Sequence, residues 1–150
     1  MPQKQAPLSK FQRRVLDDAL RLVREQRQRA EADAEATLDP AAAWATRFGL
    51  GYFLGAIDGL CQVHGVRFDG TALAIYGLVL DDTFGRPRSD ALRQQGVALL
   101  QANDADFARG RPWGGNEAIG LAKGMMEPVG LVYLARGDED RMGPPEEDAG

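Results

Sequence analysis

Apolar residues recur at helical spacing near the start of the chain. They are Phe11, Val15, Ala19, Leu22 and Val23. Ser9 and Gln12 fit a capping box, in which a hydroxyl and an amide satisfy free N–H groups of a first helical turn. The pattern predicts an amphipathic helix that begins at residue 9 and has one apolar face.

The apolar face stops after Val23, and residues 24–37 are rich in Arg, Gln, Glu and Ala. These residue types are good helix formers. The helix therefore either continues as a solvated arm or gives way to a disordered linker, and the pattern leaves both open.

The most apolar part of the chain follows Asp39 and Pro40. Aspartate suits a helix N-cap, and proline suits the first helical position because its missing N–H is not needed there. We predict one helix from Pro40 to about His64, ended by Gly65. Since this segment is apolar nearly all round, we expect it to be the central, buried helix.

Three further helices are predicted after this central one, over about 72–83, 89–102 and 116–126. A buried strand is the rival interpretation for 72–83, but no second strand is evident to pair with it. We expect a turn or short helical fragment at 103–110, a loop at 110–115 and a kink at Pro128, followed by a last apolar run. This loop would lead into a helix capped by Asn116.

These elements predict an all-α, single-domain bundle of about five helices around the central apolar helix. The expected organisation is a flexible tail at 1–8, a helical domain at 9–136 and an acidic disordered tail at 137–150. Within the domain, 9–38 is the basic helix or arm and 39–136 is the core. The length of 150 residues and the apolar content of 44% suit one globular domain.

Few residues are suited to metal or redox chemistry. Cys61 is the single cysteine and His64 the single histidine, so we predict no disulfide, metal or cofactor. Polar residues open the chain, and Arg47 and Asp58 interrupt its most apolar stretch. We therefore expect neither a signal peptide nor a membrane span, and by elimination a cytoplasmic protein.

Charge is distributed unevenly along the chain. Residues 1–30 contain eight Lys/Arg and three Asp/Glu, whereas the rest contains ten and nineteen. A basic first helix could contact nucleic acid or an acidic protein face, but the acidic body and the pI of about 5.0 disfavour nucleic acid. A solvated helix face, or docking onto the protein's own acidic body, is favoured instead. Candidate partner contacts are Arg13, Arg14 and Arg21, with Arg111 and Trp113 from the glycine-rich loop.

Glycines at a spacing of four are the most unusual feature of the central helix. A glycine inside a helix costs about 0.5–1 kcal/mol relative to alanine, so close approach of another group should offset the loss. We favour tight packing of the central helix on the fifth helix, with a ligand or partner groove as the alternative. The candidate groove residues are Gly51, Tyr52, Gly55, Asp58, Gly59, Gly120 and Gly124.

Asp58 is the one acidic residue among those glycines. We favour a place at the solvent edge or a pairing with Arg47 or Arg93, because an unpaired buried carboxylate is costly. The alternative is a carboxylate that lines a pocket with a raised pKa.

The run from Gly51 to Gly59, followed by predicted helical runs to about residue 105, resembles the small all-α immunity proteins that bacteria use against secreted amidase toxins. The likeness covers about a third of the chain and depends on glycines and one Asp. That family is exported and disulfide-bonded, and this chain, with only Cys61, departs from it in both respects. We do not assign the chain to the family.

No catalytic dyad, triad or metal set stands out, so the leading hypothesis is a non-enzymatic helical interaction protein. It would be an adaptor, inhibitor, immunity or chaperone-like module that binds a protein partner, and homodimerisation through the first helix is also open. The alternative is a small enzyme or ligand-binding protein with a pocket around Asp58 between the second and fifth helices. Nucleic-acid association through the basic helix ranks third.

Overall fold

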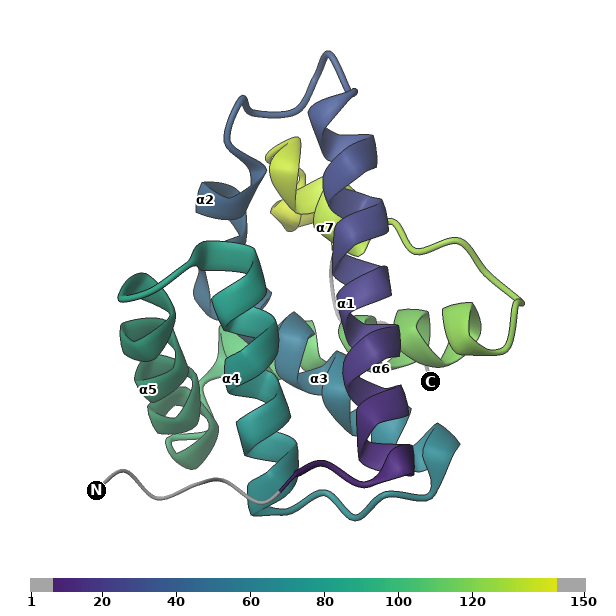
Figure 1. Ribbon diagram of the computed structural model, residues 1–150. Helices are drawn as coiled ribbons and strands as arrows, with labels where there is room; N and C mark the ends of the chain where they lie inside the picture. The colour runs from purple at the N-terminus through teal and green to yellow at the C-terminus, as the bar shows by residue number, and fades with distance from the viewer. Residues whose placement is uncertain (1–6, 143–150) are drawn as a thin grey trace, which may run out of the picture.

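The computed structural model describes residues 7–142, and all regular structure within them is helical (Figure 1). The all-α prediction is confirmed. The helices are α1 (Lys10–Glu31), α2 (Pro40–Trp44), α3 (Arg47–His64), α4 (Gly70–Phe84), α5 (Arg88–Gln101), α6 (Ala105–Ala122), α7 (Gly130–Ala135) and the short 3-10 helix η1 (Glu139–Arg141). The bundle contains more helices than the five expected, because one predicted helix is divided and α7 forms separately.

Helix α1 begins as predicted, with the capping box of Ser9 and Gln12 formed in both directions. It continues to Glu31, and Gln26 and Ala30 in its second half are buried. Residues 24–31 are therefore packed helix, whereas residues 32–37 form a non-helical connection to α2. Phe11 differs from the expectation, since 51% of its surface is exposed.

The predicted single helix over 40–64 is divided between Trp44 and Arg47. The Thr46 hydroxyl accepts a hydrogen bond from Gly49 N and caps α3 (3.0 Å). Trp44, which ends α2, is fully buried, and its indole N–H donates to the Leu131 carbonyl (2.8 Å). The separate α2 thus packs against α7.

Helix α3 is the buried centre that the sequence predicts, and its most extensive contact is with α6. In Figure 1, α1 runs in front of α3 and α6, α4 and α5 pack side by side, and α7 lies behind the upper part of α1. The segment expected as 72–83 is helix α4, so the strand interpretation is wrong. The buried Tyr76 hydroxyl of α4 donates to the Leu50 carbonyl (3.0 Å) and ties α4 to α3.

The two predicted tails extend beyond the described part of the chain: residues 1–6 and 143–150 lie outside it. Residues 137–142, which we expected in the acidic tail, contain η1 and bury Met142. Among residues 7–142, no helix combines the length and hydropathy required to cross a bilayer.

Candidate functional site

Helices α3 and α6 cross with backbone against backbone. A methyl group added to Gly51 would overlap the Phe107 carbonyl oxygen, and one added to Gly55 would overlap that of Arg111. One added to Gly59 would lie 2.8 Å from the Gly115 oxygen. The glycines of α3 therefore offset their helix-propensity cost by close packing, as the favoured interpretation expects.

The matching glycines of α6 are not the predicted pair. Gly110 approaches the Phe48 carbonyl, and Gly114 approaches the Tyr52 carbonyl, so that both helices contribute bare backbone. Gly120 instead lies beneath the Met126 side chain, and Gly124 follows the helix at a φ of +67°. The expected packing of Gly120 and Gly124 on α3 is therefore wrong.

The error arose because residues 110–115 were predicted to be a loop, whereas they lie inside α6, which begins at Ala105. Three glycines and Pro112 are typical of loops when only local preferences act. Here contact with α3 stabilises the helix. Met125 and Met126, expected inside a helix that kinks at Pro128, lie beyond its end and are exposed.

An open groove of about 380 Å³ runs along the outer side of this crossing. One wall carries Asp58 and Gln62 from α3, and the other carries Arg111 and Asn116 from α6. Asp58 Oδ2 lies 3.5 Å from Arg111 Nη2, and about a third of each side chain is exposed. Asp58 thus sits at the solvent edge in an ion pair, but its partner is neither Arg47 nor Arg93. Arg47 pairs with Asp104 instead.

Tyr52 points away from this groove into a buried polar network. Its hydroxyl accepts a hydrogen bond from Gln26 Nε2 (2.9 Å) and donates to Glu117 Oε1 (2.6 Å). Burial raises the pKa of Tyr52 well above its ordinary value, and the nearby Glu117 charge raises it further. The hydroxyl therefore stays protonated and serves as a donor.

The Glu117 carboxylate is the acceptor on which this network converges. Besides the tyrosine, it accepts hydrogen bonds from the backbone N–H groups of Val129 and Gly130 (2.9 Å each). Gln26 Oε1 accepts from Leu131 N (2.8 Å). Among the described residues, no buried side-chain nitrogen or oxygen lacks a hydrogen-bond partner. The network thus fixes the start of α7.

The sequence analysis predicted neither Gln26 and Glu117 as members of the buried network nor Gln62 and Asn116 as groove residues. Gln26 and Glu117 are polar residues of kinds that usually face solvent, and no local signal marks them as buried. Asn116 was expected to be an N-cap but is exposed on the groove wall within α6. Only knowledge of how α3 and α6 cross could have identified the two groove residues.

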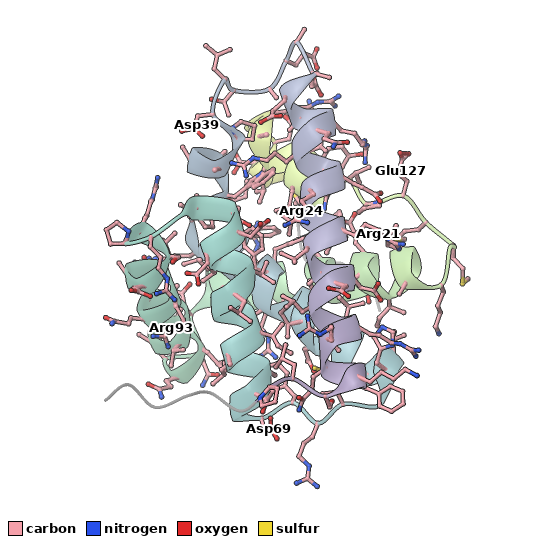
Figure 2. The ribbon with its side chains drawn as sticks, in the orientation of Figure 1. Arg21, Arg24, Asp39, Asp69, Arg93 and Glu127 are labelled. Atoms are coloured by element: carbon pink, nitrogen blue, oxygen red, sulfur yellow. The ribbon has the colours of Figure 1, made fainter. Side chains whose placement is uncertain are left out.

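The predicted contacts on α1 divide into two groups. Arg21 pairs with Glu25, and Arg24 forms a two-pronged contact with Asp82 of α4 (3.1 and 2.6 Å). Figure 2 labels Arg21 and Arg24 on α1 and Glu127 on the loop after α6. Arg13 and Arg14 are exposed instead, and the Arg14 guanidinium lies 5.6 Å from the centre of the Phe11 ring.

Trp113 and Arg111 lie on α6 and not on a loop, and both are partly buried. Trp113 lines a cavity of about 260 Å³ together with Tyr133 and Arg136. Arg111 belongs to the α3–α6 groove, so the two predicted contacts open onto different sites.

Cys61 and His64 complete the reactive side chains of α3. Burial raises the pKa of the Cys61 thiol to about 11, and the Asp58 and Asp69 charges add to this shift. His64 Nε2 lies 2.8 Å from Asp18 Oδ2, and the contact links α3 to α1. The described residues contain no cluster of three or more His, Cys, Asp or Glu that could hold a metal ion. The thiol is a packed core group with little thiolate at neutral pH.

Comparison with protein-family models, with curated proteins and with solved structures finds no match to this chain.

Proposed function

We propose that this protein is a non-enzymatic helical interaction module that binds a protein partner in the groove between α3 and α6. The observation that carries the proposal is the form of this groove, which is open along both helices. Asp58 and Arg111 balance in charge, and Gln62 and Asn116 supply both donors and acceptors. Such a lining suits the alternating N–H and C=O groups of a partner's main chain.

The rival proposal, a small enzyme or ligand-binding protein, requires a deep pocket with Asp58 at its floor. Asp58 lies at the edge of an open groove and is paired, and Tyr52 is engaged inside the core. This geometry supports the interaction module over the rival. A cytoplasmic location remains part of the proposal, and homodimerisation is one form that the partner could take.

The test is site-specific photo-crosslinking in the protein's own host. A benzophenone amino acid replaces Gln62 or Asn116 in the groove, and the same group at Gln95, exposed on α5, is the matched control. We expect one protein adduct at both groove positions and not at Gln95. The purified partner should then bind Asp58→Lys at least tenfold more weakly, because the substitution leaves two cations facing each other.

Adducts that are equal at all three positions would contradict the proposal, as would a partner whose affinity is unchanged by Asp58→Lys. Turnover of a small substrate that disappears in Asp58→Asn would establish the rival.

A further inference from the structure

The cations at the two ends of α1 differ in whether they form ion pairs. Arg21, Arg24, Arg27 and Arg29 each form an ion pair within the protein. Lys10, Arg13 and Arg14 form none with any described residue, and all three are exposed. The second group follows the i, i+3, i+4 spacing and so shares one outward face of the helix.

The position of these three cations is electrostatically unfavourable to the isolated protein. The N-terminal end of a helix carries the positive end of its dipole, where acidic residues are stabilising and basic ones are not. The first turn of α1 contains no acidic residue. Asp17, one turn further along, forms no ion pair with Arg13 or Arg14. No acidic side chain among residues 7–142 forms an ion pair with the cluster.

Phe11 adds an exposed apolar group beside the cations. Half of its surface is exposed although it lies at the start of an otherwise packed helix. The Arg14 guanidinium over its ring joins the aromatic and basic groups into one surface. Aromatic and arginine side chains together are typical of the residues that contribute most to protein interfaces.

We propose that Lys10, Phe11, Arg13 and Arg14 form a docking surface for an acidic segment of a protein partner. An acidic segment complements three cations that form no ion pair with a described residue, and an apolar residue within that segment can cover Phe11. The net charge of −4 disfavours a long phosphate polyanion, which would contact more of the protein than these few cations. The helix cannot insert into a membrane surface either, because its apolar face, including Val15 and Leu22, is buried in the core.

This inference rests on the proposed function only in that the ligand is a protein. The surface lies on α1, and its variants leave the α3–α6 groove unchanged, so each proposal can fail without the other.

The experiment measures binding of a fluorescein-labelled peptide of Asp and Glu with a central Leu-Leu pair to the full chain. The test variant carries Lys10→Gln, Arg13→Gln and Arg14→Gln. The control carries Arg93→Gln, Lys123→Gln and Arg141→Gln, which removes the same charge from exposed positions elsewhere that form no ion pair with a described residue. We expect roughly tenfold or greater weakening in the test variant, less than about twofold in the control, and loss of binding as salt screens the charges.

A second pair of variants tests the apolar part. Phe11→Ala should weaken the peptide several-fold while keeping its salt dependence, whereas Leu78→Ala, at an exposed leucine of α4, should not. Equal weakening by the two triple variants, or absence of peptide binding, overturns the proposal. Tighter binding to anionic vesicles or to a single-stranded oligonucleotide than to the peptide also overturns it. Circular dichroism confirms that each variant is folded, as exposed positions should allow.

Discussion

Helices α6 and α7 both pack on the centre of the molecule, but by different means. The α3–α6 contact is made of backbone, since Gly55 and Gly114 leave no room for side chains. The start of α7 is held by polar side chains, with Glu117 and Gln26 accepting its backbone N–H groups. Tyr52 belongs to both, because its carbonyl faces Gly114 and its hydroxyl joins the network. The α3–α6 contact requires positions that carry no side chain. The contact at α7 requires that each buried N–H donor meets an acceptor.

The glycine contact should be the less tolerant of substitution. We expect Gly114→Ala to lower the free energy of unfolding by about 3 kcal/mol, because the new methyl overlaps the Tyr52 carbonyl and a helix backbone cannot yield as a side chain does. Urea denaturation followed by circular dichroism measures the change.

The control for this substitution is Gly70→Ala at the start of α4, where an added methyl meets nothing within 4 Å. It should change stability by less than about 1 kcal/mol, and in the stabilising direction. A Gly114→Ala protein as stable as the Gly70→Ala protein would show that α3 and α6 do not approach as closely as described.

The hydrogen-bonded contact at the start of α7 should lose stability when one carboxylate oxygen is replaced. Glu117→Gln replaces an acceptor with an NH2 group that faces donors, so at least one buried donor loses its partner. We expect a loss of about 1–3 kcal/mol. Hydrogen exchange should accelerate at the amides of Val129, Gly130 and Leu131 more than in α4.

Glu127→Gln is the matched control, since the Glu127 side chain is 71% exposed and lies on the loop before α7. Its effect should stay below about 0.5 kcal/mol. Uniform acceleration of exchange across all helices in Glu117→Gln would mean that the network stabilises the whole fold and does not attach α7 in particular.

The difference between the two contacts also explains which features could be predicted from the sequence. The glycines of α3 follow a helical spacing, so a close approach was foreseeable, and Ser9, Asp39 and Gly65 marked real helix ends. The partner helix was misplaced because local preferences favour a loop wherever Gly114, Gly115 and Pro112 gather. The contact that overrides those preferences comes from a segment roughly sixty residues away in sequence.

The network around Glu117 could not be predicted for a different reason. Burial of Gln26 and Glu117 is stabilised by hydrogen-bond partners in α3 and at the start of α7, and neither residue alone indicates those partners in the sequence. The split between α2 and α3 has the same origin, since Trp44 is turned by its contact with Leu131. Of the groove, Asp58, the α3 glycines and Arg111 were predicted as candidates. The pairing of Arg111 with Asp58 and the place of Asn116 beside them required the true course of α6.

A second polar contact, between α4 and α5, tests whether pairing near the surface stabilises the fold less than the buried network at α7 does. Burial alone would raise the pKa of Asp81, but hydrogen bonds from Ser89 and Arg86 lower it below its ordinary value. Because its folded-state pKa is depressed, Asp81 stabilises the protein above about pH 4 and loses this contribution as pH falls through the lowered pKa.

Ser89→Ala removes one of these bonds and should cost about 1 kcal/mol at pH 7. The difference from the unmodified protein should shrink as the pH falls below about 4, measured by thermal unfolding across the acidic range. In an Asp81→Asn background the same substitution should have a pH-independent effect. If the effect of Ser89→Ala still depends on pH in the Asp81→Asn background, a group other than Asp81 causes that dependence.

The smallest effect is expected at an ion pair on the surface. Arg24 and Asp82 join α1 to α4 with good geometry, but more than half of the Arg24 side chain is exposed. Water and salt screen such pairs, so Arg24→Gln should cost only about 0.2–1 kcal/mol and less at high ionic strength. The double variant with Asp82→Asn should be no less stable than the sum of the two single variants predicts, measured as a double-mutant cycle. A loss comparable with that of Glu117→Gln would mean that charge, and not burial, determines how strongly a polar contact holds two helices of this protein together.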